Sequence, residues 1–241
     1  MAKKQQRTVG GGDKAPPKSV AKAVKKIKKV PAPRRPPKAK PIIYLYPHAP
    51  CEASVELRLT DGSRLTTLLP VPTSGASGAR TCSWRVVASP CGTLQPRAGP
   101  PVSSLFWEAT PSRDALLLPD GARDTFVVRG ACAGEWLLGA LHAWGLAPRE
   151  YTECASFWAP QMAEHPFVQV RLLPQEAWEA IAPLTVKGLP APQRTLRVFI
   201  AWRGLRAFDP RKHAGALPAP PPAREEGVSY VVEWGGQEVL R

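Results

Sequence analysis

Alternating hydrophobic and polar residues predict β-strands along most of the chain after residue 41. In 54–59, Val55, Leu57 and Leu59 fall on one face of an extended chain, and 81–88 alternates in the same way around Trp84. Side chains of a strand point alternately to its two faces, so this pattern is typical of half-buried strands. The pattern predicts strands at 42–46, 54–59, 64–69, 81–88, 104–108, 125–129, 167–172, 185–187, 195–202 and 228–234.

The sequence also predicts the neighbours of three of these strands. Asp61-Gly62 is a hairpin-turn signal between 54–59 and 64–69, so these two strands are expected to pair with each other. The strand at 228–234 closes the chain and is expected to lie at a sheet edge.

The hydrophobic period changes in the middle of the chain. Residues 135–144 carry apolar side chains at helical spacing and end at Gly145, and 149–164 predicts a second helix that Pro160 should kink or shorten. A short helical turn is expected around 177–180. Together these elements predict an α+β fold, a mainly antiparallel β-sheet or sandwich with a two-helix insert.

Residues 1–41 have a different composition from the rest of the chain. They are too poor in apolar side chains to offset the entropy of folding, so we expect a disordered tail. Within it, 19–30 has one apolar helical stripe and should fold only on a polyanion, whereas five prolines in 31–41 favour an extended spacer. The predicted organisation is therefore a tail at 1–41, an α+β domain at 42–206, and a Pro-rich loop with an edge strand at 207–241 packed on the same domain.

The positive charge of the chain is concentrated in this tail. Residues 1–41 hold 14 basic residues and one acidic residue, a net charge of +13, while the other 200 residues have a net charge of +1. Lysines neutralise nucleic-acid phosphates without reading bases, which gives affinity without sequence specificity. The predicted phosphate-binding residues are Lys18, Lys22, Lys25, Lys26, Lys28, Lys29, Arg34, Arg35, Lys38 and Lys40.

Other partners for the tail remain open. An anionic membrane surface, a nuclear import receptor that reads Lys25–Lys29 or Arg34-Arg35, and a purely solubilising role each fit a lysine-rich segment. The first aromatic residue is Tyr44, so the tail cannot stack on bases. The sequence contains no run of 18 apolar residues, so no membrane span is expected.

The sequence offers few residues for catalysis, metals or cofactors. The five cysteines include no Cys-x-x-Cys pair and no zinc-finger spacing, which favours free thiols in a reducing, intracellular compartment such as the nucleus or a virion. No phosphate-binding glycine loop or hydrolase motif occurs, so neither a cofactor nor a metal is expected. A Cys132–His142 pair is a weak candidate for catalysis. Most of the eight tryptophans fall at core positions, with Trp178 and Trp234 expected to be the exposed ones.

A series of short motifs resembles a known family. In order they are Tyr44-Leu45-Tyr46-Pro47, Trp84, Leu105-Phe106-Trp107-Glu108, Phe157-Trp158-Ala159-Pro160 and Arg197-Val198-Phe199-Ile200-Ala201-Trp202. The pattern is similar to an uncharacterised α+β domain family of bacterial and protist proteins, over roughly 42–206. That family has no established activity, so the resemblance implies a fold and no catalytic residue. Cys91-Gly92 and His165-Pro166 depart from its usual Asp-Gly and Asn-Pro-like steps.

These observations favour a non-enzymatic structural or interaction protein. Its basic tail would associate with nucleic acid, as in virion, capsid or chromatin proteins, and its body would mediate protein contacts or self-assembly. The alternatives are an enzyme or small-ligand binder, which a pocket gathering Glu108, His142 or Arg197 would favour, and a membrane-surface adaptor.

Overall fold

Three strands at the centre of the structure are buried on both faces, and they organise the fold. They are β1 (Ile42–Tyr46), β10 (Gln193–Leu205) and β11 (Ser229–Glu238). The computed structural model describes residues 40–110, 117–118, 125–213, 217 and 222–239. Within these residues Ile43 and Leu45 of β1 point into one apolar core, and Ile42 and Tyr44 point into another. A strand with two apolar faces must have a layer on each side.

The central strands belong to a seven-stranded sheet with the order β3-β6-β1-β11-β10-β8-β7. The outer strands are β3 (Leu65–Leu69), β6 (Leu105–Ala109), β8 (Phe167–Leu173) and β7 (Thr125–Arg129). All neighbouring strands run antiparallel except β10 and β11, which pair in parallel from Gln193↔Ser229 to Trp202↔Glu238.

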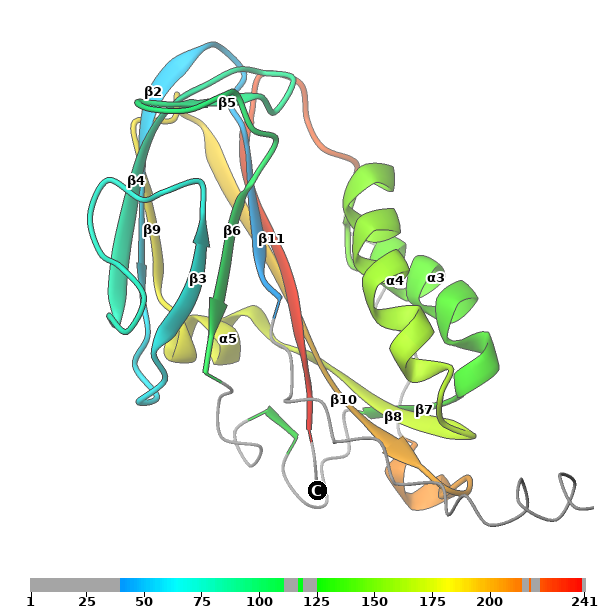
Figure 1. The fold of residues 1–241 in the computed structure, drawn as a ribbon. Coiled ribbons are helices and arrows are strands. Elements are labelled where there is room, and N and C mark those ends of the chain that lie inside the picture. Colours follow the sequence, from blue (N-terminus) through cyan, green and yellow to red (C-terminus); the bar gives the residue numbers. More distant parts are fainter. Residues whose placement is uncertain (1–39, 111–116, 119–124, 214–216, 218–221, 240–241) are drawn as a thin grey trace, which may run out of the picture. The chain divides into compact units, whose positions relative to one another are not determined.

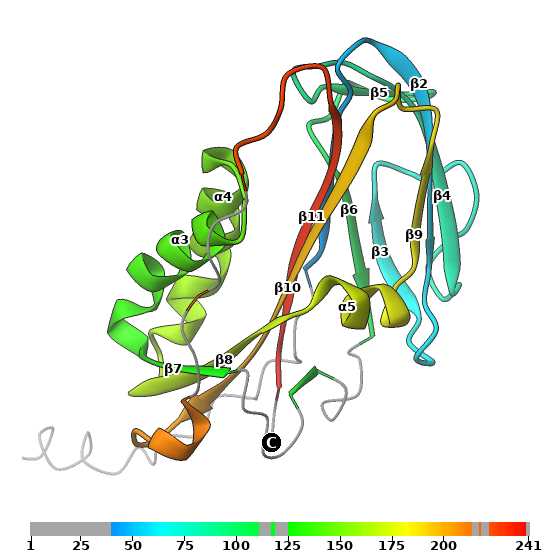
Figure 2. The same cartoon turned by 180° about the vertical axis from the view of Figure 1, so that it is seen from behind.

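A four-stranded sheet packs on one face of the large sheet (Figures 1 and 2). Its order is β5-β4-β2-β9, with β2 (Cys51–Arg58), β4 (Thr81–Ala88), β5 (Leu94–Pro96) and β9 (Leu184–Lys187). In β2 and β4 every second residue is buried, so one face of this sheet closes the core and the other faces outward. Trp84 and Trp107 lie in the core between the two sheets.

Helices cover the opposite face of the large sheet (Figure 1). The antiparallel pair α3 (Ala133–Ala143) and α4 (Pro148–Met162) buries Leu137 and Trp158 against the sheet. Helix α4 runs through Pro160 and ends two residues later. A third helix, α5 (Gln175–Ile181), follows β8 on the side of the small sheet, and two short 3-10 helices span Gly130–Cys132 and Pro210–Lys212.

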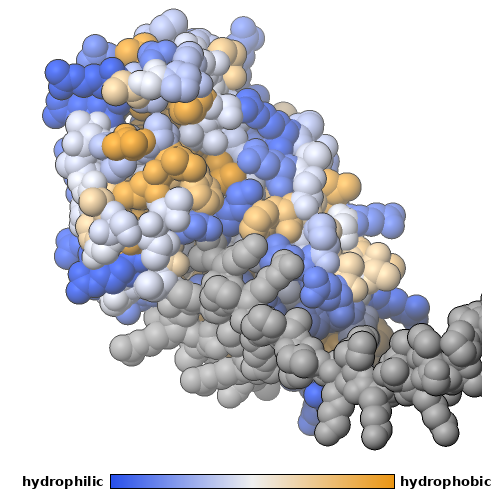
Figure 3. All heavy atoms as spheres, viewed as in Figure 1, coloured by the Kyte–Doolittle hydropathy of each residue, from blue (hydrophilic) through white to orange (hydrophobic). Residues whose placement is uncertain are grey.

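The helical layer leaves part of the large sheet uncovered. Leu69 of edge strand β3 pairs with Phe106 of β6, which pairs with Ile42, so all three point to the helical side. Leu69 is nevertheless 56% exposed and the adjacent Val71 84% exposed. They line an apolar groove of about 1120 Å³ together with Phe106 and the 98–104 loop. Figure 3 shows hydrophobic residues gathered on this face of the molecule.

The predicted fold class is confirmed. The described residues form eleven strands in two mostly antiparallel sheets and three α-helices, and the two-helix insert is present as α3 and α4. Every predicted strand from 42–46 to 228–234 is found within a few residues of its predicted bounds. The predicted disordered tail lies outside the described residues, apart from Lys40 and Pro41.

Three predictions about neighbours and exposure are wrong. Strands β2 and β3 do not form a hairpin, because β2 pairs with β4 and β9 while β3 pairs with β6 in the other sheet. Strand β11 is not at an edge but between β1 and β10. Trp178 and Trp234 are 3% and 0% exposed, because each indole N–H has a buried acceptor.

Two glycines of the helical region should respond oppositely to alanine. A Cβ at Gly130 would stand 2.0 Å from the carbonyl oxygen of His165 and 2.6 Å from that of Met162, whereas a Cβ at Gly139 meets nothing within 4 Å. Gly130→Ala should therefore lower the free energy of unfolding by about 1–3 kcal/mol or more. Gly139→Ala, in the interior of α3, should raise it by about 0.5–1 kcal/mol. Urea denaturation measures both, and equal effects of the two substitutions would contradict this packing.

Candidate functional site

Nine of the ten predicted phosphate-binding residues lie outside the described residues. The exception is Lys40, whose backbone N–H donates to the carbonyl of Gly236 over 3.2 Å. Its Nζ lies 4.2 Å from the centre of the Phe157 ring and 5.7 Å from that of Trp234. Lys40 is thus held against the folded body by cation–π contacts. Its contact with phosphate stays a prediction.

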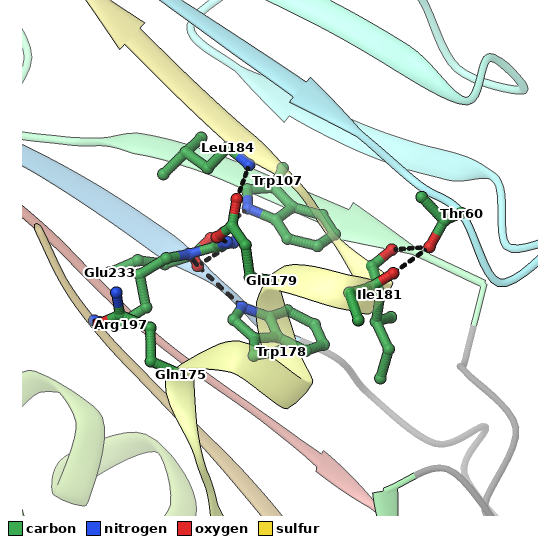
Figure 4. A network of polar contacts seen from close by, with 10 residues as sticks. Thr60, Trp107, Gln175, Trp178, Glu179, Ile181, Leu184, Arg197 and Glu233 are labelled. Carbon is green, nitrogen blue, oxygen red and sulfur yellow. Dashed lines mark hydrogen bonds and ion pairs between the residues drawn. The ribbon is translucent and has the colours of Figure 1, made fainter.

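A buried polar network joins three strands of the large sheet, β6, β10 and β11, to α5. Arg197 of β10 and Glu233 of β11 are almost fully buried, and Arg197 Nε donates to Glu233 Oε2 over 2.7 Å. The same oxygen accepts from Trp178 Nε1 over 2.8 Å, and Oε1 accepts from Trp107 Nε1 over 3.0 Å. Figure 4 shows these side chains converging on the Glu233 carboxylate. Three donors thereby replace the water that the buried carboxylate loses.

Helix α5 completes this network. Arg197 Nη1 donates to Glu179 Oε2, and the backbone N–H of Arg197 donates to Gln175 Oε1 over 3.1 Å. Arg197 Nη2 lies 2.7 Å from Glu233 Oε2 but is not aligned for a hydrogen bond. The side chains of Arg197 and Glu233 are fully inaccessible, and that of Glu179 is 43% exposed. The network therefore fixes the position of α5 on β10 and β11.

Glu108, His142 and Arg197, which would have favoured an enzyme if they lined one pocket, do not lie together. Arg197 lies between the sheets, whereas His142 is exposed on α3, on the other side of the large sheet, with its ring edge-on to Tyr151. Glu108 is a half-exposed residue of β6. Cys132 and His142 stand at opposite ends of α3, roughly 15 Å apart at 1.5 Å per residue, so they form no thiol–imidazole pair.

Within the described part of the chain, no group of three or more His, Cys, Asp or Glu side chains could hold a metal ion. None of its helices has both the length and the apolar character needed to cross a bilayer.

A second polar cluster joins β1 to α4. The Tyr44 hydroxyl donates to Glu153 Oε2 over 2.6 Å and accepts from Trp234 Nε1 over 3.0 Å. Burial, and then the Glu153 carboxylate, raise the pKa of Tyr44 well above its ordinary value. Buried Glu150 accepts from both Arg224 Nη1 and Nη2, at 3.0 and 2.5 Å. The raised pKa keeps Tyr44 protonated at neutral pH, so its hydroxyl serves as a structural donor.

The outer face of the small sheet carries a row of basic residues. Lys187 of β9 is the register partner of Ser54 in β2, and Ser54 is the partner of Arg85 in β4. Arg97 follows Pro96, the last residue of β5, which pairs with Val86, so it continues the row beyond Arg85. All three basic side chains are exposed. We call Lys187, Ser54, Arg85 and Arg97 the cationic row.

The cationic row lines a surface pocket of about 540 Å³. Gln95 and Glu52 also line it. Within the part of the chain that the structure describes, the side chains of Arg85, Arg97 and Lys187 form no ion pair or hydrogen bond. The lining of this pocket therefore holds three basic side chains and one carboxylate, that of Glu52, a charge balance that favours anions.

Sequence reasoning missed the cationic row because it depends on strand pairing. Alternation alone places Arg85 and Ser54 on the polar faces of their strands, but Lys187 lies more than 100 positions away in the chain. Only the order β5-β4-β2-β9 and its register bring these side chains into one line.

The comparisons with known proteins add no assignment. Neither a protein-family model, nor a curated protein, nor a solved structure matches this chain. The resemblance to the uncharacterised α+β family therefore gains no support from them, and function must be argued from the residues themselves.

Removal of the Glu233 charge should destabilise the body strongly. Glu233→Gln leaves the Arg197 guanidinium buried with a weakened partner, and losing one member of a buried ion pair costs about 3–5 kcal/mol. Glu225→Gln is the matched control, because Glu225 pairs with Arg194 where both side chains are about half exposed. That change should cost less than about 1 kcal/mol. Urea unfolding followed by tryptophan fluorescence compares them, and similar losses would mean that the Glu233 network contributes little.

The five free cysteines should react in an order set by burial and pKa. Cys91 is exposed, and the hydroxyl of Thr93, 3.2 Å from its sulfur, lowers the pKa of the thiol. Burial raises the pKa of Cys82 to about 12 and that of Cys154 well above its ordinary value. Because the thiolate is the reactive form, iodoacetamide should label Cys91 first and spare Cys82 and Cys154 until the protein unfolds. Peptide mass spectrometry of a time course measures this order, and early labelling of Cys154 would contradict the described core.

Proposed function

We propose that this is a non-enzymatic protein that associates with nucleic acid through its basic segment, residues 1–41. The observation that carries the proposal is the separation of charge, with a net charge of +13 in that segment and +1 in the rest of the chain. A segment that neutralises phosphates displaces condensed counterions, so it binds tightly at low salt and weakly at high salt. It carries no aromatic residue with which to read bases.

The junction between the segment and the body supports this division of roles. Lys40 donates its backbone N–H to Gly236, and the carbonyl of Pro41 accepts from the backbone N–H of Trp107 over 3.3 Å. These bonds join the end of the segment to β11 and β6, on either side of β1. The segment is therefore anchored at the middle of the large sheet, and a nucleic acid held by it would be tethered to the body.

The body itself fits a role in protein contacts better than one in catalysis. Buried Arg197, Glu233 and Glu150 are held in ion pairs within the body, and Arg197 lies on the other side of the large sheet from His142. Its exposed edge strand β3 and the apolar groove beside it offer a surface for partners or for self-assembly. Proteins with this organisation would act where nucleic acid is packed, in a virion or in the nucleus, the latter with an import receptor.

The proposal predicts that charge in the tail, rather than lysine itself, sets the affinity. In the full chain, replacing Lys18, Lys22, Lys25, Lys26, Lys28 and Lys29 by Gln should weaken binding to a labelled DNA duplex. It should also reduce the slope of log K against log salt by about 0.9 for each lysine that contacts a phosphate. The matched variant with Arg at the same six positions should bind like the wild type. Fluorescence anisotropy over a salt series measures both, with single-stranded RNA as a second probe.

Two results would overturn the proposal. Unchanged binding by the Gln variant would remove the tail from the interface, and absence of binding by the wild type would remove nucleic acid as the partner. Binding of the wild-type chain to anionic vesicles, but not to the duplex, would instead favour a membrane-surface adaptor.

A further inference from the structure

We propose that the cationic row on the outer face of the small sheet is a second nucleic-acid contact, which binds backbone phosphates. This inference rests on the proposed function and extends it from the tail to the folded body. It is carried by the arrangement of Lys187, Ser54, Arg85 and Arg97 across four neighbouring strands.

The row has the dimensions of a short stretch of nucleic-acid backbone. Neighbouring strands lie about 4.8 Å apart, so a row across four strands extends roughly 14 Å. A DNA duplex carries one charge for about every 1.7 Å of its axis, so several phosphates fall within that length. Two of the three cations are arginines, whose planar guanidinium groups can donate two parallel hydrogen bonds to one phosphate, and the Ser54 hydroxyl adds a neutral donor.

Two positive charges of the row stand side by side in the protein alone. Arg85 and Arg97 occupy neighbouring positions on adjacent strands, and like charges placed opposite each other destabilise a sheet. Among the described residues, no carboxylate forms an ion pair with Arg85, Arg97 or Lys187. A bound polyanion would remove this repulsion.

Two carboxylates set the direction in which a phosphate chain would lie. Glu52 and Glu56 flank Ser54 on the outer face of β2, opposite Val87 and Ser83 of β4. On β2, negative charge therefore lies on both sides of the row, whereas the residues opposite these carboxylates on β4 are neutral. A phosphate backbone is therefore expected to run across the strands, along the row, rather than parallel to them. The residues that line the pocket include no aromatic side chain, so the contact would not read bases.

The test uses the full chain and two matched double variants. Arg85→Gln with Arg97→Gln removes two charges from the row, and Arg129→Gln with Arg206→Gln removes two exposed charges elsewhere on the body. Anisotropy with a labelled duplex should show a salt slope smaller by about 1.8 and a Kd raised roughly tenfold or more for the first variant only. Thermal unfolding of the first variant should show no marked loss of stability, because both side chains are exposed and form no ion pair. Equal effects of the two double variants, or no effect of the first, would overturn the inference.

The tail variant separates this inference from the proposed function. If the Lys→Gln tail variant binds less tightly and the Arg85/Arg97 variant binds normally, the tail is the interface and the row is not. If only the Arg85/Arg97 variant binds less tightly, the row is the interface and the proposed role of the tail is wrong. Loss in both variants supports both contacts, and absence of binding by the wild type overturns both.

A competition experiment distinguishes nucleic acid from a free phosphate compound. Unlabelled duplex should displace the labelled probe from the wild-type chain more effectively than inorganic tripolyphosphate at equal phosphate concentration. If tripolyphosphate competes better with the wild type and loses that advantage in the Arg85/Arg97 variant, the row is a site for small polyphosphates, and the assignment to nucleic acid is overturned.

Discussion

The carboxylate of Glu233 is the point on which the layers of this protein depend. It stands in β11, in the middle of the large sheet, and takes hydrogen bonds from β10, β6 and α5 through Arg197, Trp107 and Trp178. A charged group in an apolar core is tolerated only when its hydrogen-bonding capacity is satisfied. Each of these elements must therefore reach its correct place for the others to be stable. Because the Arg197, Trp107 and Trp178 donors are bound to Glu233 inside the core, they do not contact partners at the surface.

Local pattern was enough to predict the strands and helices but not their partners. Alternation in 81–88 and the helical spacing in 135–144 depend on neighbours within a few residues, and both elements are found. Pairing depends on residues far away. Asp61-Gly62 is an ordinary turn signal, yet the chain uses it to cross from the small sheet to the large one. Strand β11 was expected at an edge, and its two-sided burial becomes clear only when β1 and β10 are placed beside it.

The two candidate phosphate-binding sites differ in the same respect: one depends on local sequence and the other on strand pairing. The net charge of residues 1–41 can be read from composition alone, because it is a sum over residues and depends on no partner strand. The cationic row, in contrast, is made of residues from three separate parts of the chain and exists only in the folded sheet. Trp178 and Trp234 show the same limit for the core, since their buried acceptors come from Glu233 and Tyr44 on other strands.

The central position of β11 has a consequence for how the protein is made. Strands β1 and β10 both pair with β11, so neither has its full set of backbone partners until residues 229–238 have left the ribosome. The large sheet therefore closes late and through contacts between distant parts of the chain, which is the kind of topology that folds slowly. Residues 1–41 are synthesised before the body. A chain cut short before β11 would carry the basic segment without the central strand to which Lys40 bonds.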